Sequence, residues 1–363
     1  MDMEIKYQNP SGETVTFWPQ RFTPLTCEDF VTAHNTGTNS YEIRADAKAI
    51  EICTPNGQIK REERGQITMP IDFHRSLPVY ALVEGGWLPP PLVNPPAYLF
   101  DRNVIGYIQQ ISKGNSRDLY TNVDWWLQMI ANKAHFNPFL HAFESNKQTI
   151  PDLEEFKRSY EEAVEIIRDL FPNAEITEYR DEHFAAALET MADVLKFHAE
   201  ETEFLQRVAP LIRESVSENS LQRVCEQILT IATDIGLPLK SLPLIATLSC
   251  LYEDRMVSGY NAARELLKLR GGPYTSEKAY NVLSDMRGLM FYLAFRALAR
   301  QVGEEPLAYC TADKAALLFG CGLNSNNVEF RGNELFLSME LSEFLFPRLR
   351  SEKRQELARR IEA

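Results

Sequence analysis

A proline-rich stretch constrains this sequence more than any other feature and divides it into two parts. Residues 87–96 read WLPPPLVNPP, and a helix interior or a central strand cannot continue through so many residues that lack an N–H. We expect an extended linker here. Before it, ETVTFW, SYEIRA and KAIEIC are typical of strands, and TPNGQ at 54–58 contains the Asn-Gly turn signal. The sequence therefore predicts a small β-rich N-terminal module over residues 1–95 and a second domain over residues 96–363.

The second part alternates a few short strands with many helices. AYLFD (97–101) and PLAYCTAD (306–313) are short apolar segments that each end in an aspartate, and LFLSMEL is a third candidate strand before a final helix. An acidic stretch at about 175–240 predicts a helical insertion, and residues 280–300 predict a buried helix. One more helix is indicated by apolar residues that share one helical face, namely Tyr160, Ala163, Val164, Ile167, Leu170 and Phe171. The fold class we predict is α/β, with a short parallel sheet and many helices.

Composition excludes several kinds of protein. With 363 residues, 44% of them hydrophobic, the chain can bury a sizeable core. No run of about eighteen uncharged apolar residues occurs, and the start, MDMEIKYQNPSGE, has no basic region followed by an apolar one. We expect a cytoplasmic protein that does not bind a membrane. The six cysteines and six histidines form no CxxC or HExxH group, so a zinc site is unsupported and the cysteines are predicted to be free thiols.

The net charge limits how nucleic acid could bind. A formal charge of −13 argues against recognition through the overall field, because phosphate contacts need clustered Lys and Arg. A phosphodiester would instead need a local basic strip or a divalent metal ion.

Two aspartates follow predicted strands directly. Asp101 ends AYLFD and Asp313 ends PLAYCTAD. In open α/β sheets the carboxyl ends of parallel strands face the site crevice, so acids at these positions point toward it. Each aspartate could equally cap the helix that follows it, since Asp is a favoured N-cap residue.

These segments carry a family resemblance. YLFDRNVIGYI resembles the opening of PIN-like nucleases, in which an apolar strand ends in Asp, Asn follows two residues later and an apolar helix begins. CTADKAALL is similar to the strand-end motif of the same family, NPFLHAFESN offers a glutamate on an apolar helix, and AYNVLSDMRGLMFYLAF offers an aspartate at the start of a buried helix. The resemblance covers roughly residues 97–325, although the segment between the second and third acids is longer than in small PIN domains.

The resemblance implies a divalent-metal site. It assigns the metal-binding and catalytic roles to Asp101, Glu144, Asp285 and Asp313, with Asn103 and Thr311 as the supporting polar residues. Glu253 or Asp254 is the alternative for the third acid. Four clustered carboxylates would raise one another's pKa unless a cation neutralised them, and oxygen ligands favour Mg²⁺ or Mn²⁺. Such ions can activate water for in-line attack at phosphorus, so we expect phosphodiester hydrolysis.

Partners follow from the same resemblance. Most members of the family cut RNA, so RNA is preferred over DNA as substrate, and single strands are preferred because cations are scarce. Cations beside the candidate acids could contact phosphate, namely Arg102, Arg255, Arg287 and Lys314. The basic tail FPRLRSEKRQELARRIE is a second candidate strip, against the simpler interpretation of an amphipathic terminal helix. An inhibitory protein partner and a homo-oligomer stay open, as does the role of residues 1–95.

Rival functions lack their motifs. A haloacid-type phosphatase needs a second aspartate where Asn103 stands, and no GxxxxGK, GxGxxG or nucleophile-elbow motif occurs. The alternative that stays open is a PIN-like fold that serves only as a binding or scaffold module, in which the acids are helix caps.

Overall fold

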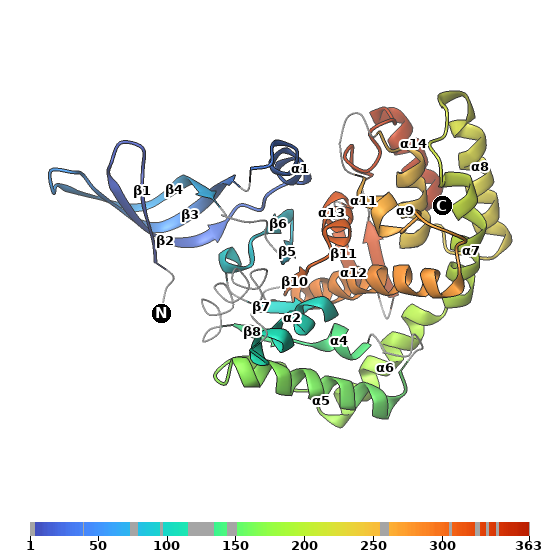
Figure 1. Ribbon diagram of the computed structural model, residues 1–363, viewed down its shortest axis with the longest axis horizontal. Coiled ribbons are helices and arrows are strands. Elements are labelled where there is room, and N and C mark those ends of the chain that lie inside the picture. Colours follow the sequence, from blue (N-terminus) through green and yellow to red (C-terminus); the bar gives the residue numbers. More distant parts are fainter. Residues whose placement is uncertain are drawn as a thin grey trace.

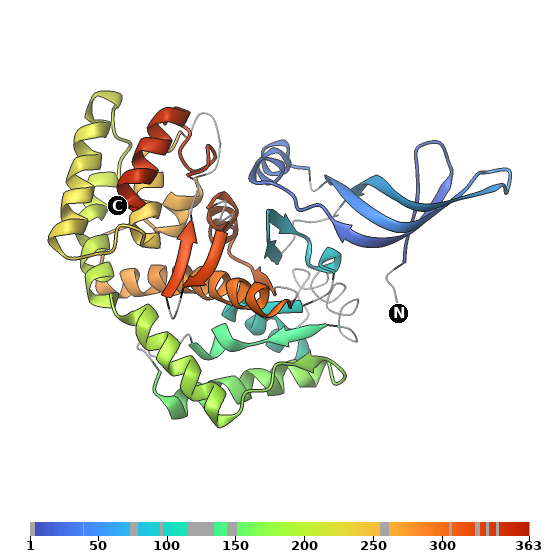
Figure 2. The same ribbon diagram turned by 180° about the vertical axis from the view of Figure 1, so that it is seen from behind.

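The computed structural model describes most of the chain, namely residues 4–38, 40–72, 79–94, 97–114, 134–143, 151–254, 261–304, 307–323, 327–331, 334–338 and 341–362. A small antiparallel sheet projects to one side of a larger body built from a second sheet and its helices (Figures 1 and 2). Within the described residues, no helix is both long and apolar enough to span a bilayer.

The N-terminal module is a four-stranded antiparallel sheet in the order β1-β2-β3-β4, with one helix, α1 (Cys27–Thr36). Its strands are β1 (Ile5–Gln8), β2 (Thr14–Phe22), β3 (Ser40–Cys53) and β4 (Ile59–Asp72). The Asn-Gly signal lies in the β3–β4 turn, where Gly57 has a φ of 81° that favours glycine. Alternate residues of the long strands, such as Ile43 and Ala45, are buried, which confirms the β-rich prediction.

The prediction of an extended linker at residues 87–96 is wrong. This segment contains β6 (Gly86–Leu88) and a 3₁₀ turn (Pro90–Leu92), and its residues up to Val93 are buried. Trp87 is packed in an aromatic cluster, and the Tyr98 hydroxyl donates a hydrogen bond of 2.8 Å to the Pro90 carbonyl. Prolines suit such a place because they bring no N–H that burial would leave without an acceptor.

The division between the two parts therefore falls earlier than residue 95. β5 (Tyr80–Val83) and β6 belong to the second sheet, where β5 pairs antiparallel with β10 (Ala308–Thr311). The two parts are also joined closely, because the Trp87 indole donates a hydrogen bond of 3.0 Å to the Thr26 carbonyl just before α1.

The second sheet has the order β6-β5-β10-β7-β8-β9, and four of its strands are parallel. These are β7 (Ala97–Phe100), β8 (His135–Asn137), β9 (Glu175–Ile176) and β10. The prediction of an α/β fold with a short parallel sheet is confirmed at this level. Because β10 lies beside β7, the ends of two strands about two hundred residues apart in the sequence become neighbours.

Helices surround this sheet and fill the long segment between β9 and β10. Those next to the sheet in sequence are α2 (Arg102–Ser112), α4 (Phe139–Phe143), α5 (Leu153–Leu170) and α13 (Lys314–Gly322). The predicted insertion is helical, with α6 (Asp181–Leu195), α7 (His198–Ile212) and α8 (Glu218–Asp234). It continues into α9 (Leu242–Leu251), α11 (Ala262–Leu266) and α12 (Ser276–Val302). On α5 the predicted face is largely buried, including Tyr160, Ala163 and Ile167.

The C-terminal segment holds the third predicted strand and the final helix. β12 (Glu334–Ser338) pairs with β11 (Asn327–Arg331) in a separate two-stranded sheet, and α14 (Ser351–Glu362) ends the chain.

Helix α12 lies against strand β10 at an unusually short distance. A Cβ atom placed on Gly288 would lie 2.9 Å from the Tyr309 hydroxyl oxygen, closer than side-chain atoms normally approach. Glycine at this position therefore leaves room for the Tyr309 hydroxyl beside the helix. This contact is about one helical turn from Asp285.

Candidate functional site

The ends of β7 and β10 bring two predicted aspartates to the same edge of the sheet. Phe100 pairs with Cys310 in the parallel register, and the Asp101 N–H donates a hydrogen bond of 2.9 Å to the Cys310 carbonyl. Asp313 follows β10 by two residues. The carboxyl ends of parallel strands are where α/β proteins place their sites, so this edge is the candidate site.

Asp101 stands at the N-cap of α2 but makes no side-chain capping hydrogen bond. The residue is only 6% exposed, and its Oδ2 accepts a hydrogen bond of 2.7 Å from the Thr311 hydroxyl. The Asn103 amide nitrogen lies 3.5 Å from the same oxygen. The structure thus places both predicted supporting residues beside Asp101, and capping does not explain why an acid is buried there.

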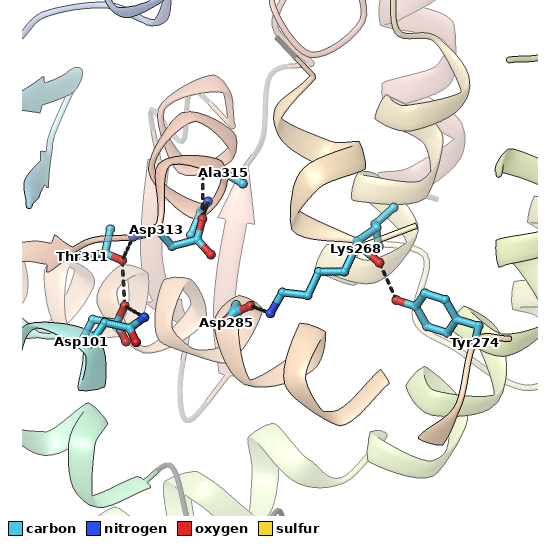
Figure 3. Close-up of polar contacts among 10 residues, drawn as sticks. Asp101, Lys268, Tyr274, Asp285, Thr311, Asp313 and Ala315 are labelled. Carbon is cyan, nitrogen blue, oxygen red and sulfur yellow. Dashed lines mark hydrogen bonds and ion pairs between the residues drawn. The ribbon is translucent and has the colours of Figure 1, made fainter. Parts of the chain in front are cut away.

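Asp313 does cap its helix. Its Oδ1 accepts hydrogen bonds of 2.7 Å and 3.0 Å from the N–H groups of Ala315 and Ala316. Both bonds use the same oxygen, and Oδ2 accepts none from the part of the chain that the structure describes. The Asp313 N–H donates to the Thr311 hydroxyl at 2.9 Å, so Thr311 links the two strand-end aspartates (Figure 3).

Asp285 approaches from α12. The expectation that it opens the helix is wrong, because α12 begins at Ser276 and is capped by Thr275. Its side chain is 21% exposed, and Oδ2 accepts a hydrogen bond of 2.6 Å from the Lys268 ammonium, which reaches toward it from the segment after α11 (Figure 3). After burial, the negative charges of Asp313 and Asp101 are among the causes that raise the pKa of Asp285.

Burial and mutual repulsion perturb two of these acids. Burial raises the pKa of Asp101 to about 6, against the Thr311 hydrogen bond that lowers it, and the Asp313 charge raises it further. Burial likewise raises the pKa of Asp285 to about 7, although Lys268 opposes the rise. Both carboxylates thus sit where the ionised form is disfavoured, and a nearby cation would reverse that preference.

Glu253, an alternative for the third acid, forms an ion pair away from the strand-end aspartates. Its carboxylate lies 2.6 Å from the Arg264 guanidinium in a buried ion pair that joins the end of α9 to α11. A buried carboxylate committed to a guanidinium is costly to remove from it. Asp285 is thus the acid that the structure brings to the strand-end aspartates.

Other predicted residues are placed less favourably. Glu144 and Arg255 lie outside the described residues. Arg287 is 4% exposed, and its guanidinium donates a hydrogen bond of 2.6 Å to His198 on α7. Burial and this internal partner argue against the predicted contact of Arg287 with substrate phosphate. Two residues along a helix differ by about 200°, so Arg287 cannot share the face of Asp285.

The remaining two cations stay near the edge. Arg102 and Lys314 are the first residues of α2 and α13, and both are half-buried. The Arg102 charge, after burial, is a cause of the lowered pKa of His141, which is about 4. A half-buried cation at each strand end is compatible with the predicted phosphate contact.

The basic tail behaves as a terminal helix packed on the body. Leu357 and Ile361 are buried, and Arg360 forms two hydrogen bonds of 2.8 Å to Glu226 on α8. Arg348 pairs with Glu218 in the same way. Much of the tail's positive charge is therefore neutralised by the protein itself, as in the simpler interpretation of this segment.

Lys268 and Asn137 are site residues that the sequence did not reveal. Lys268 lies in LLKLRGG, which matches no motif; its backbone is left-handed, with a φ of 50°, and its ammonium contacts Asp285. Asn137 ends β8 at the same edge, where its Oδ1 accepts a hydrogen bond of 3.0 Å from the Phe139 N–H. A three-residue strand is too short to recognise from sequence, so this third strand end gave no signal.

The donor chemistry suits a hard cation, but its geometry is incomplete. Carboxylate and hydroxyl oxygens are the ligands that Mg²⁺ and Mn²⁺ prefer. Among the described residues, however, no three acidic, histidine or cysteine side chains converge closely enough to share a metal ion. Lys268 pairs with Oδ2 of Asp285. A bound cation would therefore compete with the Lys268 ammonium for the negative charge of Asp285.

Comparison with known proteins leaves this site to be interpreted from its own residues: no family model, no curated protein and no solved structure matches the chain.

Proposed function

We propose that this chain is a metal-dependent nuclease of the PIN-like kind that hydrolyses phosphodiester bonds, with single-stranded RNA as its preferred substrate. The observation that carries the proposal is Asp101. It is a buried aspartate at a strand end that makes no side-chain capping hydrogen bond, is oriented by Thr311, and lies within electrostatic range of a second strand-end aspartate. Burying such a group costs free energy unless a cation compensates it.

The residues divide into ligands and supports. Asp101, Asp285 and Asp313 are the proposed carboxylate ligands for Mg²⁺ or Mn²⁺. Thr311 holds one oxygen of Asp101 and so fixes the direction of the other. A bound divalent ion would lower the pKa of a coordinated water and stabilise charge on the phosphate. Glu144 remains the proposed fourth acid, because it follows α4 directly in the sequence.

Substrate recognition in this proposal is local. The sequence as a whole is acidic, so attraction of a polyanion must come from the metal and from cations at the sheet edge, of which Arg102 and Lys314 are the nearest in sequence to the two strand-end aspartates. The preference for RNA follows from the resemblance to PIN-like nucleases and is an analogy at the level of the family.

A cleavage assay tests the proposal. Labelled single-stranded RNA and DNA are incubated with wild type, Asp101→Asn and the control Asp169→Asn, an exposed aspartate on α5, while Mn²⁺ or Mg²⁺ is titrated. We expect metal-dependent cleavage that falls at least about 100-fold in Asp101→Asn only, since loss of a ligand exceeds the effect of losing a ligand's supporting partner. Circular dichroism verifies that each variant is folded. Absence of both cleavage and metal binding in wild type would refute the proposal.

The second candidate function is a PIN-like binding or scaffold module without catalysis. The observation that favours it is that two of the three aspartates already have structural partners, since Asp313 caps α13 and Lys268 neutralises Asp285. This candidate predicts that Mn²⁺ leaves the melting temperature of the wild type unchanged. It also predicts that substitution of Asp101 affects stability and not any metal-dependent property.

A further inference from the structure

A cationic surface lies beside the candidate site, in a part of the chain to which the sequence assigned no role. It consists of Lys268 and Arg270 in the loop after α11, Lys278 in the first turn of α12, and Arg213 just after α7. We name these four residues the cationic rim. They are drawn together by the loop LKLRGGPY, because Arg213 and Lys278 donate hydrogen bonds to its carbonyls at Gly272 and Arg270.

Two members of the rim repel each other and have no acidic partner. The Arg213 charge is a cause, after burial, of the lowered pKa of Lys278, so the two cations are within interaction range. Within the described residues neither forms an ion pair. Like charges placed together on a protein of net charge −13 cost free energy, and a bound anion would repay that cost.

The other two members connect this pair to the carboxylates. Lys268 contacts Asp285 directly, and Arg270 is 84% exposed, with Glu265 as its partner at 2.9 Å. Lys278 and Asp285 are seven residues apart on α12, so they lie on nearly the same face, separated by about 10 Å along the axis. The rim therefore extends from the acidic site along one side of α12. Figure 3 shows its first member, Lys268, beside Asp285.

The rim is also held rigidly enough to act as a surface. The Arg264 guanidinium, already paired with Glu253 in the core, donates a hydrogen bond of 2.7 Å to the Arg213 carbonyl. The Tyr274 hydroxyl donates to the Leu267 carbonyl at 2.9 Å and closes the loop. Lys278 lies 5.4 Å from the centre of the Tyr274 ring. These contacts fix the cations before any ligand arrives, which lowers the entropic cost of binding.

We infer that the cationic rim binds the phosphates of a single-stranded nucleic acid next to the bond that is cut. The inference rests on the proposed function, because it takes the polyanion to be that enzyme's substrate. It assigns Arg213 and Lys278 to sequence-independent phosphate contacts, and it solves the problem posed by the negative net charge.

Binding in the absence of divalent ions tests the inference separately from cleavage. Fluorescence anisotropy measures the affinity for a labelled single-stranded RNA 20-mer in EDTA at several salt concentrations. The variants are Arg213→Gln with Lys278→Gln, the charge-preserving Arg213→Lys with Lys278→Arg, and the control Lys353→Gln with Arg359→Gln on α14. The control removes the same charge from the basic tail.

We expect the neutral rim variant to bind more weakly, with the slope of log K against log salt reduced by about 1.4, since each phosphate contact on a single strand contributes about 0.7. The charge-preserving and tail variants should keep the wild-type slope. The inference is overturned if wild type does not bind the RNA, if the neutral variant binds like wild type, or if the charge-preserving variant loses as much as the neutral one. RNA binding with the expected slopes but no metal-dependent cleavage would remove the proposed function and retain the rim.

Discussion

At the scale of single residues, Thr311 carries the most information about the site. Its hydroxyl oxygen accepts the Asp313 N–H, and its hydrogen goes to Asp101, so the direction of donation is fixed. A hydroxyl used in this way fixes the orientation of the Asp101 carboxylate through its Oδ2. Loss of a partner of this kind typically lowers metal affinity by about 10–100-fold.

Two substitutions of Thr311 test the contribution of its hydroxyl separately from that of its side-chain volume. Thr311→Val keeps the volume but removes the hydroxyl, and we expect Mn²⁺ affinity to fall by about 10–100-fold. Thr311→Ser retains the hydroxyl and should stay within about 3-fold of wild type, well inside the range for a lost supporting partner. Calorimetric titration with Mn²⁺ measures both. Equal affinities of the valine and serine variants would show that Thr311 does not orient a ligand.

Lys268 is predicted to compete with the metal. In Lys268→Met the ammonium is lost while the length of the side chain is kept, so Asp285 becomes available to the cation. A partly exposed ion pair contributes up to about 1 kcal/mol, which corresponds to at most about 5-fold tighter Mn²⁺ binding. Electron paramagnetic resonance of free Mn²⁺ measures the change against Lys353→Met as control. Weaker binding would instead mean that Lys268 positions Asp285 for the ion.

At the scale of secondary-structure elements, the strand ends were predictable, whereas the helix carrying the third acid was predicted with the wrong start. AYLFD and PLAYCTAD predict strands because each is a short apolar run that ends in a polar residue. Asp285 was expected at a helix start, since LSD precedes an apolar run. In fact, the helix is capped by Thr275, whose side chain accepts from the Lys278 N–H, and it begins at Ser276, nine residues before Asp285. A helix starts where a side chain can cap its first N–H groups, so the position of the most apolar run does not locate the helix start.

The cap of α13 and the proposed ligand role of Asp313 can be separated. Asp313→Ala removes the side chain that accepts from Ala315 and Ala316, and it should lower the free energy of unfolding by about 1 kcal/mol. Asp313→Asn keeps a capping oxygen, so its stability should be close to that of wild type. Urea denaturation measures the two stabilities, and calorimetry measures Mn²⁺ binding. We expect both variants to lose metal affinity; retention of affinity in the asparagine variant would leave Asp313 with the cap alone.

At the scale of the whole molecule, the sequence predicted the sheet class but not how the parts join. The β-rich start, the parallel sheet and the helical insertion were all visible in local patterns. The prediction of a linker at residues 87–96 failed because a high proline content indicates only that a segment cannot form regular backbone hydrogen bonds. It does not indicate whether the segment is buried. Trp87 and the strands β5 and β6 complete the second sheet through contacts distant in sequence, which periodicity cannot reveal. The cationic rim was missed for the same reason.

The stability of the molecule should depend on pH through its site. The pKa values of Asp101 and Asp285 are raised to about 6 and about 7, above the ordinary value near 3.9 of an unfolded chain. Their protonated forms are thus favoured by folding. This contribution is fully present below about pH 4 and is lost as the pH rises through about 7. Without metal, the acidic site therefore opposes folding at pH 8.

Thermal unfolding in EDTA tests whether the ionised Asp101 lowers the stability of the protein at high pH. Asp101→Asn should melt at a higher temperature than wild type at pH 8, and the difference should shrink toward pH 5. The exposed control Asp169→Asn corrects for the general effect of removing a charge from an acidic protein. Mn²⁺ should then stabilise wild type more at pH 8 than at pH 5. An Asp101→Asn variant that is less stable than wild type at every pH would assign Asp101 to the structure alone.

The contact between Gly288 and Tyr309 bears on the spacing of the three aspartates. The first carbon of any side chain at residue 288 would meet the Tyr309 hydroxyl at 2.9 Å, so the helix or the ring would have to shift. Asp285 is carried on that helix one turn away, whereas Asp101 and Asp313 follow the strands β7 and β10. A single methyl group at residue 288 is therefore expected to change the separation of Asp285 from the other two aspartates without altering any carboxylate.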